Sequence, residues 1–534
     1  MTSVVGLSFV QRARVESVRR TYLLPAVFVL AGLLAPLVFA RAELVVRNED
    51  SFEYITGSQS ILQAHHYLAL SGRPQTVFPP GYSLAIVPFA LLFKPILAAK
   101  IVSWLSSGVS VLLVFLIGRE WFGTRISVLA ALLFSLFPLR VWLSQTAQSE
   151  SLYVMLLLLA IWMTIRIKAA RPASAAAVGA IVGWAYLTRP EAVILIVILG
   201  LLFLVSSIRT RRNFKSFLAY TAAVLVIVVP YVLWLSFHAG AFVVTGKGRG
   251  EIGRGIARLE GKSDVLMRRL SNDDSAIVIA TTSPGLRETV VHTARDLELL
   301  KKLVLSNSGV QPIAAGFILL GLLEIFRSVI QGGLWSFGLL QLFFVSHLVL
   351  YSPFWIEERL LYASSPALCL WMAVGIATVF KLMTRESSES RRSQLFAMTM
   401  ISILTAAILG SYALKLRSTR ITDEKTGASQ EMALLILQRP DLREQGVIGE
   451  YPGISFFAGT RHEWMPYCDL DQLRRFGSIN HASLIAFSEQ DARTPATERL
   501  LAGNYAAEDA QFVARVRFGS QDLQMFSLSP IASK

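Results

Sequence analysis

Eleven long apolar runs dominate this sequence and limit what it can fold into. A helix that crosses the hydrocarbon core of a bilayer needs about 20 apolar residues. The runs lie at residues 22–40, 97–118, 126–143, 151–167, 173–187, 192–208, 217–237, 312–326, 334–350, 360–380 and 395–414. Only 16% of the residues are charged, whereas soluble domains have about 25%. The chain is therefore predicted to be a polytopic α-helical membrane protein with about eleven transmembrane helices.

A shorter apolar stretch, residues 82–93, follows Pro79-Pro80-Gly81 and stops at Lys94-Pro95. This length is short for a crossing. The stretch is predicted to be an interfacial or re-entrant piece on the outer side.

The basic residues predict the orientation of the spans, because they accumulate in short cytoplasmic loops. With a cytoplasmic N-terminus, the short loops on the outer side hold only Arg140, Arg189 and Arg359. The cytoplasmic segments hold eighteen basic residues: Arg12, Arg14, Arg19, Arg20, Arg119, Arg125, Arg166, Lys168, Arg171, Arg209, Arg211, Arg212, Lys215, Arg327, Lys381, Arg385, Arg391 and Arg392. The net charge of +15 is therefore mostly a signal of topology, and no nucleic-acid partner is expected.

Three hydrophilic regions are then predicted outside: a first outer loop at 41–81, a large outer loop at 239–311, and the tail, residues 415–534. The tail alternates helical and strand-like patterns at 431–437, 446–450, 469–476, 483–487, 511–518 and 523–528. It is predicted to be a small extracytoplasmic α/β domain, and residues 1–414 the transmembrane catalytic domain. No Asn-x-Ser/Thr sequon occurs, which favours a bacterial envelope.

Acidic residues occupy the predicted outer rim. Glu49 and Asp50 follow the first span, where a carboxylate can take a proton from an attacking hydroxyl or hold a divalent cation beside a phosphate. They could also be ordinary charges of a solvated loop. Glu150 begins the fourth span, where an acid is costly unless it is paired or faces water. The alternative for Ser149-Glu150 is a helix N-terminal cap.

Arginines share this rim. Arg189 lies in Thr188-Arg189-Pro190-Glu191, and Arg359 follows Glu358. Guanidinium groups at this depth suit bidentate contact with a phosphate, although each could instead pair with its neighbouring glutamate. Arg140, Arg189 and Arg359 oppose the charge bias of their side, so we expect a phosphate at these arginines. The Gly/Arg-rich residues 246–255 are either a linker or a substrate-gripping lid.

Together these features resemble the GT-C superfamily of polytopic glycosyltransferases, in particular bacterial members similar to protein mannosyltransferases and aminoarabinose transferases. The resemblance covers the whole chain and includes the outer α/β tail. It departs from the aminoarabinose transferases where Val77-Phe78 stands in place of a charged residue before Pro79. Its motifs are Glu49-Asp50, Pro79-Pro80-Gly81-Tyr82, Ser149-Glu150, Thr188-Arg189-Pro190-Glu191 and Glu358-Arg359-Leu360.

The resemblance implies transfer of a sugar, with inversion, from a polyprenyl-phosphate donor to an envelope acceptor that is a lipid, a glycan or a protein. The site would lie at the outer face of the bacterial inner membrane. Asp50 would be the catalytic base, with Glu49 assisting it or sharing a divalent metal ion. The remaining implied roles are a second acid at Glu150, donor-phosphate binding by Arg189 and Arg359, and substrate contacts from Tyr54, Tyr82 and Glu358.

Two alternatives come from other functional classes. A transporter or flippase of lipid-linked glycans would also use many spans, but neither inverted repeats nor midplane charges are evident in the sequence. A polymerase of such glycans would also place charges outside, usually without an α/β domain. The acids gather at one face, which favours surface chemistry.

Overall fold

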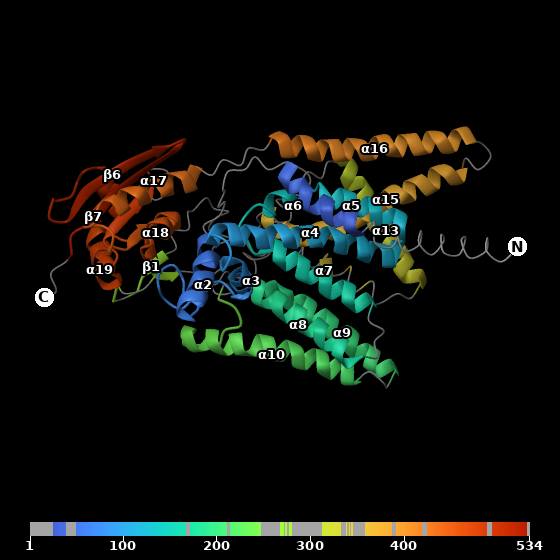
Figure 1. The fold of residues 1–534 in the computed structure, drawn as a ribbon, viewed down its shortest axis with the longest axis horizontal. Coiled ribbons are helices and arrows are strands. Elements are labelled where there is room, and N and C mark those ends of the chain that lie inside the picture. Colours follow the sequence, from blue (N-terminus) through green and yellow to red (C-terminus); the bar gives the residue numbers. More distant parts are fainter. Residues whose placement is uncertain are drawn as a thin grey trace, which may run out of the picture.

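The computed structural model describes residues 25–38, 50–166, 171–210, 214–246, 268–271, 273–274, 277–279, 312–332, 338, 341, 343–344, 358–386, 391–418, 424–488 and 494–530. Long helices form one elongated bundle, and a β-sheet domain built from the C-terminal residues lies at one end of it (Figure 1). Five of the described helices are long and apolar enough to cross a membrane: Pro95–Phe122, Pro190–Ile208, Phe214–Ala239, Tyr362–Thr384 and Met398–Arg417. The chain is a multi-pass helical membrane protein, while the count of eleven spans and their orientation stay predictions.

The bundle begins with the apolar helix Pro25–Val38. Its further helices are α2 (Asp50–Ala64), α3 (Gly81–Ala90), α4 (Pro95–Phe122), α5 (Thr124–Ser135), α6 (Pro138–Leu143), α7 (Glu150–Arg166), α8 (Pro172–Thr188), η1 (Pro190–Ala192), α9 (Val193–Thr210), α10 (Phe214–Ala239), α13 (Pro312–Gly332), η4 (Glu358–Ser364), α15 (Ser365–Glu386) and α16 (Arg391–Ser418). The run predicted at 334–350 lies mostly outside the described residues.

One predicted span is wrong as a single helix. Residues 126–143 divide into α5, which ends at Ser135, and α6, which begins at Pro138. Proline has no backbone N–H to donate and its ring clashes with the preceding turn, so it starts a helix more readily than it continues one. The break turns the chain back into the protein, and every residue of α6 is buried.

The stretch predicted to be short and interfacial forms α3, which packs against α2, α4 and α8. Gly81 makes this packing close. A Cβ atom at this position would lie 2.6 Å from the backbone of Leu187 and Thr188 at the end of α8. The Pro79-Pro80-Gly81 turn therefore sits directly against the residues that lead to Arg189.

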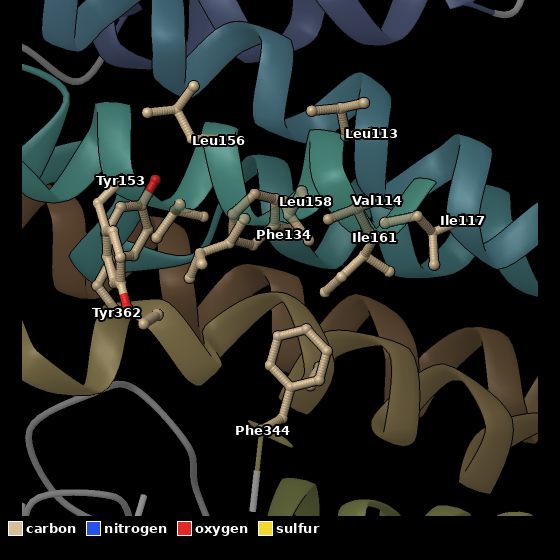
Figure 2. Close-up of a cluster of buried hydrophobic side chains, with 14 of the residues drawn as sticks. Leu113, Val114, Ile117, Phe134, Tyr153, Leu156, Leu158, Ile161, Phe344 and Tyr362 are labelled. Atoms are coloured by element: carbon tan, nitrogen blue, oxygen red, sulfur yellow. The ribbon is translucent and has the colours of Figure 1, made fainter. Parts of the chain in front are cut away.

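The bundle core is apolar and joins helices that are distant in sequence. Figure 2 shows Val114 of α4, Ile161 of α7 and Phe134 of α5 within one cluster of buried side chains. Tyr362 of η4 stacks on Phe134, with ring centroids 6.3 Å apart. Tyr153 and Tyr362 lie at one end of this cluster (Figure 2). Burial of this kind fixes η4 and the start of α7 relative to each other, and both carry charged residues.

The C-terminal domain is a mixed sheet covered by helices, as the tail pattern predicts. The order of strands in its five-stranded sheet is β4-β3-β5-β7-β6, with β3 parallel to β4 and β5, and β7 antiparallel to β5 and β6. The sequence pattern missed β4, α18 and α20. The elements are α17 (Glu424–Gln438), β3 (Val447–Gly449), α18 (Pro452–Ala458), β4 (His462–Trp464), α19 (Leu470–Asn480), β5 (Leu484–Ser488), α20 (Pro495–Leu501), β6 (Ala510–Phe518) and β7 (Gln521–Leu528).

Two segments that are predicted to be outer loops contact the domain. Phe52 of α2 packs on Phe456 of α18, with ring centroids 5.0 Å apart, and the His462 amide donates to Leu70 O (3.3 Å). The described part of the large outer loop contains β1 (Arg268–Leu270) and β2 (Ile277–Ile279), which pair antiparallel. Arg268 of β1 forms an ion pair with Glu450 beside the sheet. The domain is thus docked directly on α2, the helix that begins at Asp50.

Candidate active site

Four segments place charged side chains together at the end of the bundle that faces the sheet domain. Asp50 is the first residue of α2, and Glu150 is the first residue of α7. Carboxylates are favourable at helix N-termini, where unpaired N–H groups give a partial positive charge. Arg189 follows the last residue of α8, and Arg359 is the second residue of η4. All four are predicted site residues, and the structure brings them together.

Ion pairs connect these side chains in one chain of contacts. Arg359 Nη1 lies 2.8 Å from Asp50 Oδ2, and Arg359 Nε lies 3.9 Å from Glu150 Oε1. Arg189 Nη1 donates to the same Glu150 oxygen at 2.7 Å, and its Nη2 contacts Glu191 Oε1 at 3.1 Å. The alternative that each arginine pairs with its neighbouring glutamate is therefore confirmed in part for Arg189, which pairs with Glu191 and also with Glu150. Glu150 links the two arginines.

Burial differs along this chain of ion pairs. The side chains of Glu150 and Arg189 are 6% and 10% exposed, whereas those of Asp50 and Arg359 are 24% and 23% exposed. Charges held in such partial burial interact more strongly than at a free surface, because water screens them less. Asp50 and Arg359 form the end of the cluster that solvent reaches.

Neighbouring aromatic residues hold the buried end. The Tyr54 hydroxyl lies 3.2 Å from Ser149 Oγ, which ties α2 to the residue before Glu150. The guanidinium of Arg189 stands over the Tyr153 ring, 5.9 Å from its centroid. Burial, together with the nearby Asp50 carboxylate, raises the pKa of Tyr54 well above its ordinary value. Tyr54 is therefore a neutral hydrogen-bonding group at physiological pH.

Three further predicted site residues lie elsewhere or outside the described part. Tyr82 is fully buried, and its hydroxyl donates to Ala99 O (2.8 Å) and lies 2.7 Å from Ser103 Oγ. Glu49 and the side chain of Glu358 lie outside the described residues. Substrate contacts by Tyr54, Tyr82 and Glu358 stay predictions, and in this structure both tyrosine hydroxyls face protein partners.

Arg140 does not join the cluster, contrary to the expectation that it holds a phosphate. Its side chain is fully buried, with Nη1 donating to Gly32 O (3.1 Å) and Ser107 Oγ (2.9 Å), and Nη2 donating to Ser135 O. The break before Pro138 carries it inward, so Arg140 connects three helices of the bundle. The charge bias alone could not distinguish this arginine from the two at the rim.

A buried carboxylate in α2, Glu53, was not predicted to matter. Its Oε2 accepts hydrogen bonds from Leu70 N (3.0 Å) and Gln75 Nε2 (2.7 Å). The available signal was its spacing of three residues from Asp50, which places the two on neighbouring positions of one helix. Its partners could not be read from the sequence, because they depend on how the loop after α2 folds back.

Glu49 and Asp50 are possible ligands of a divalent metal ion, the alternative to Glu49 assisting the base. Within the described ranges no three His, Cys, Asp or Glu side chains are grouped closely enough to hold a metal ion. Glu49 is not among the residues described, so the metal stays a prediction. The two cysteines, Cys369 and Cys468, are both free and buried.

Comparison with known proteins confirms the resemblance. Residues 78–234 match the family model of dolichyl-phosphate-mannose-protein mannosyltransferase. No curated protein sequence is significantly similar to the chain.

Solved structures share the fold. ArnT from Cupriavidus metallidurans, bound to undecaprenyl phosphate, superposes with a TM-score of 0.57 at 13% identity, covering 94% of this chain and 97% of that one. The Archaeoglobus fulgidus oligosaccharyltransferase in complex with Zn and sulfate gives 0.57 at 14% identity, covering 87% and 67%. The archaeal oligosaccharyltransferase AglB, from the same organism, with an inhibitory peptide and a dolichol-phosphate, gives 0.53 at 13% identity, covering 88% and 70%. At these identities the likeness is one of fold.

Proposed function

Because its fold is that of ArnT and its residues 78–234 match a mannosyltransferase family, we propose that this chain is a GT-C membrane glycosyltransferase. It transfers a sugar from a polyprenyl-phosphate donor to an envelope acceptor, which is a lipid, a glycan or a protein. The convergence of Asp50, Glu150, Arg189 and Arg359 at one end of the bundle carries this proposal. A lipid-linked donor suits it, since the sugar and phosphate reach such a rim while the polyprenyl chain stays in the bilayer.

Asp50 acts as the general base in this proposal. The acceptor hydroxyl oxygen attacks the anomeric carbon and forms the new glycosidic bond, while its proton passes to the Asp50 carboxylate. The bond between the anomeric carbon and the phosphate oxygen breaks, and the polyprenyl phosphate leaves with the electron pair. Attack opposite the departing phosphate inverts the anomeric centre. Asp50 suits the role because it lies at the more exposed end of the cluster.

Arg359 and Arg189 stabilise the departing phosphate. Negative charge grows on the phosphate as the bond breaks, so guanidinium groups placed beside it lower the barrier. In the structure these arginines contact Asp50, Glu150 and Glu191. Guanidinium N–H groups that do not contact these carboxylates would donate to the phosphate oxygens. Glu150, which contacts both arginines, keeps them side by side.

A divalent cation would suit the charge of this site. The cluster holds three carboxylates, Asp50, Glu150 and Glu191, and two guanidinium groups, which leaves a formal charge of −1 before an anionic donor arrives. Asp50, together with the preceding Glu49, would hold the cation, which would neutralise phosphate charge. Base catalysis by Asp50 and arginine contact with the phosphate remain the roles of the chain itself.

The proposal places the enzyme in the bacterial inner membrane, with a cytoplasmic N-terminus and with both the site and residues 415–534 on the outer face. The sheet domain lies at one end of the bundle, close to α2, the helix that begins at Asp50 (Figure 1). This proximity supports a common side for the site and the domain.

Reconstituted proteoliposomes test the proposal. The wild type and Asp50→Asn are supplied with a polyprenyl-phosphate sugar and an envelope extract, and labelled sugar in the acceptor is measured. We expect Asp50→Asn to lower transfer by about 10²- to 10⁴-fold, the usual contribution of a general base. Asp441→Asn, in an exposed ion pair of the C-terminal domain, is the matched control and should leave transfer unchanged.

The outcomes separate the candidate functions. Retained transfer by Asp50→Asn would rule out its role as the base. Translocation of the lipid-linked sugar without transfer would favour the flippase, and elongation of a lipid-linked glycan would favour the polymerase. Glycan and lipid profiling of a deletion strain then identifies which envelope component loses a sugar.

A further inference from the structure

Glu53 is a buried carboxylate one helical turn after Asp50 in α2. Glu53 is 6% exposed, and its Oε2 accepts hydrogen bonds from Leu70 N (3.0 Å) and Gln75 Nε2 (2.7 Å). Among the described residues no arginine or lysine forms an ion pair with it. A buried acid held only by amides is costly, since burial disfavours its charge. Such a group needs a reason beyond stability.

The contacts of Glu53 continue into the loop that follows α2. Gln75 is buried, and its Oε1 accepts hydrogen bonds from Val77 N (3.1 Å) and Phe78 N (3.2 Å). The Tyr67 hydroxyl donates to Phe78 O (2.9 Å) and Pro79 O (3.2 Å). The segment 67–79 is thus held through both its carbonyl and its amide groups. Two side chains of α2 tie it to that helix: Glu53, and Ser60, whose Oγ accepts a hydrogen bond from Leu68 N (3.1 Å).

This segment ends against two other parts of the site. It leads into Gly81, which abuts Leu187 and Thr188, and Gly81 O accepts a hydrogen bond from Trp184 Nε1 of α8 (3.2 Å). Arg189 follows immediately. On the other side, Phe78 packs on the Tyr54 ring, with centroids 5.2 Å apart, and the Tyr54 hydroxyl contacts Ser149, next to Glu150.

We propose that Glu53 is a positioning residue for sugar transfer: through Leu70 and Gln75 it fixes the segment 67–79, and thereby holds Asp50, Glu150 and Arg189 in register around one substrate. This inference rests on the proposed function of the site. Glu53 itself does not touch the substrate. A displacement of about 1 Å in such a constellation can cost about 100-fold in rate, which is the scale on which the positioning acts.

The charge of Glu53 gives the role a distinctive pH dependence. Burial, with repulsion from Asp50 and Glu463, raises the pKa of Glu53 to about 7, although the Leu70 and Gln75 amides donate to it. The charged and titratable groups that act on it are these two carboxylates and the Tyr67 hydroxyl. Glu463 is itself paired with Arg73. Hydrogen bonds to an ionised carboxylate are about twice as strong as neutral ones. Ionisation of Glu53 therefore tightens the segment.

Transfer kinetics test the positioning. We expect Glu53→Ala to lower kcat by about 10- to 100-fold, with a smaller change in the donor KM, and Gln75→Leu to have a similar effect. Glu53→Gln keeps an acceptor oxygen for both amides, so it should approach the wild type at pH 6. It should also lack the rise in kcat that the wild type shows near pH 7. Glu431→Ala, an exposed acid of α17, is the control.

Amide hydrogen exchange gives a readout that needs no activity. A peptide covering Leu70 to Phe78 contains the three amides held by Glu53 and Gln75. We expect its exchange to be at least about 10-fold faster in Glu53→Ala and in Gln75→Leu, with peptides of the sheet domain unchanged.

Each outcome decides the matter. Faster exchange, lower kcat and a lost pH step in Glu53→Gln support the positioning. Unchanged exchange in both Glu53→Ala and Gln75→Leu overturns it, and so does faster exchange with wild-type kcat. If Glu53→Ala does not fold, Gln75→Leu and the pH profile of Glu53→Gln decide. Absence of transfer by the wild type from every donor overturns the proposed function instead, and exchange alone then decides whether Glu53 orders the segment.

Discussion

Arg359 connects the two carboxylates with the clearest proposed roles, Asp50 at 2.8 Å and Glu150 at 3.9 Å. A guanidinium can bridge groups in this way because its donors are spread over a rigid plane, whereas an ammonium is a point charge. The residue is only 23% exposed, so water cannot substitute fully for a lost contact. The bridging geometry, and not the positive charge alone, is therefore what Arg359 contributes.

Substitution of Arg359 by lysine tests this distinction. We expect Arg359→Lys to lower kcat/KM for the donor by about 10- to 100-fold, or about 1.4 to 2.7 kcal/mol of transition-state stabilisation. Arg439→Lys, in an exposed pair with Asp441, is the matched control and should be silent. Initial rates at varied donor concentration measure both. A wild-type kcat/KM for Arg359→Lys would show that a positive charge at this position is enough and that the bridging geometry of the guanidinium is not needed.

Glu53 should make the folded protein less stable as pH rises. An acid paired at the surface has the opposite effect, because its pKa is lowered and its contribution to stability is lost as pH falls. Its pKa is raised from 4.5 to about 7, so its ionised form is disfavoured in the folded protein. Relative to the neutral Glu53→Gln, the wild type should therefore lose stability as pH rises from about 4.5 to about 7, with no further loss above that pH. The full difference is about 3 kcal/mol. Melting temperatures of both proteins in detergent from pH 5 to pH 8 measure it.

A constant difference in melting temperature across this pH range would contradict the prediction. The expected result also has a functional meaning, since the ionised form that destabilises the fold is the one that tightens the loop. Such opposition between stability and activity is common at functional sites.

At the scale of elements, the close approach of α3 to the end of α8 ties the Pro79-Pro80-Gly81 turn to Arg189. We expect Gly81→Ala to destabilise the protein by about 1 to 3 kcal/mol, because its Cβ would lie 2.6 Å from backbone atoms that cannot move aside cheaply. Transfer should fall as well, since the same displacement reaches Arg189. Gly410→Ala in α16 is the control, because no atom lies within 4 Å of its added Cβ.

Thermal melting and transfer assays of both glycine variants measure this prediction. Wild-type melting and transfer for Gly81→Ala would mean that α3 can shift away from α8 without disturbing Arg189.

Elements differ in how far their sequence predicts them. The hairpin of β6 and β7 follows from two patterned runs around Gly519, and α19 begins with the Asp469–Gln472 capping box. The three-residue strand β4 has no pattern long enough to recognise. The break between α5 and α6 was hidden because apolar residues continue across Pro138.

The sequence predicts which residues belong to the site better than it predicts which of them contact each other. Asp50, Glu150, Arg189 and Arg359 are recognisable because charges at the rim of apolar runs are unusual. That Arg359 reaches Asp50 while Arg140 turns inward depends on packing among helices far apart in sequence. The role of Gln75 depends in the same way on the path of the loop after α2.

For the whole molecule, the charge asymmetry predicts that the site and the sheet domain share the outer side. Asp471 in α19 is exposed. The substitution Asp471→Cys should therefore introduce a thiol that reacts with an impermeant maleimide in intact spheroplasts. The substitution Arg125→Cys, in a predicted cytoplasmic loop, should introduce a thiol that reacts only after the membrane is permeabilised. The native Cys369 and Cys468 are buried, which keeps the background low. The reverse labelling pattern would contradict the predicted orientation.

The ion pair between Asp50 and Arg359 joins residues 309 positions apart, and this separation has a consequence for synthesis. Ribosomes add about 5 to 20 residues per second, so Arg359 emerges about 15 to 60 seconds after Asp50. In the predicted orientation, the first outer loop is translocated during that interval, before Arg359 has been added to the chain. The site is therefore assembled late, and a nascent chain that stalls before η4 would carry the proposed base, Asp50, without its ion-pair partner Arg359.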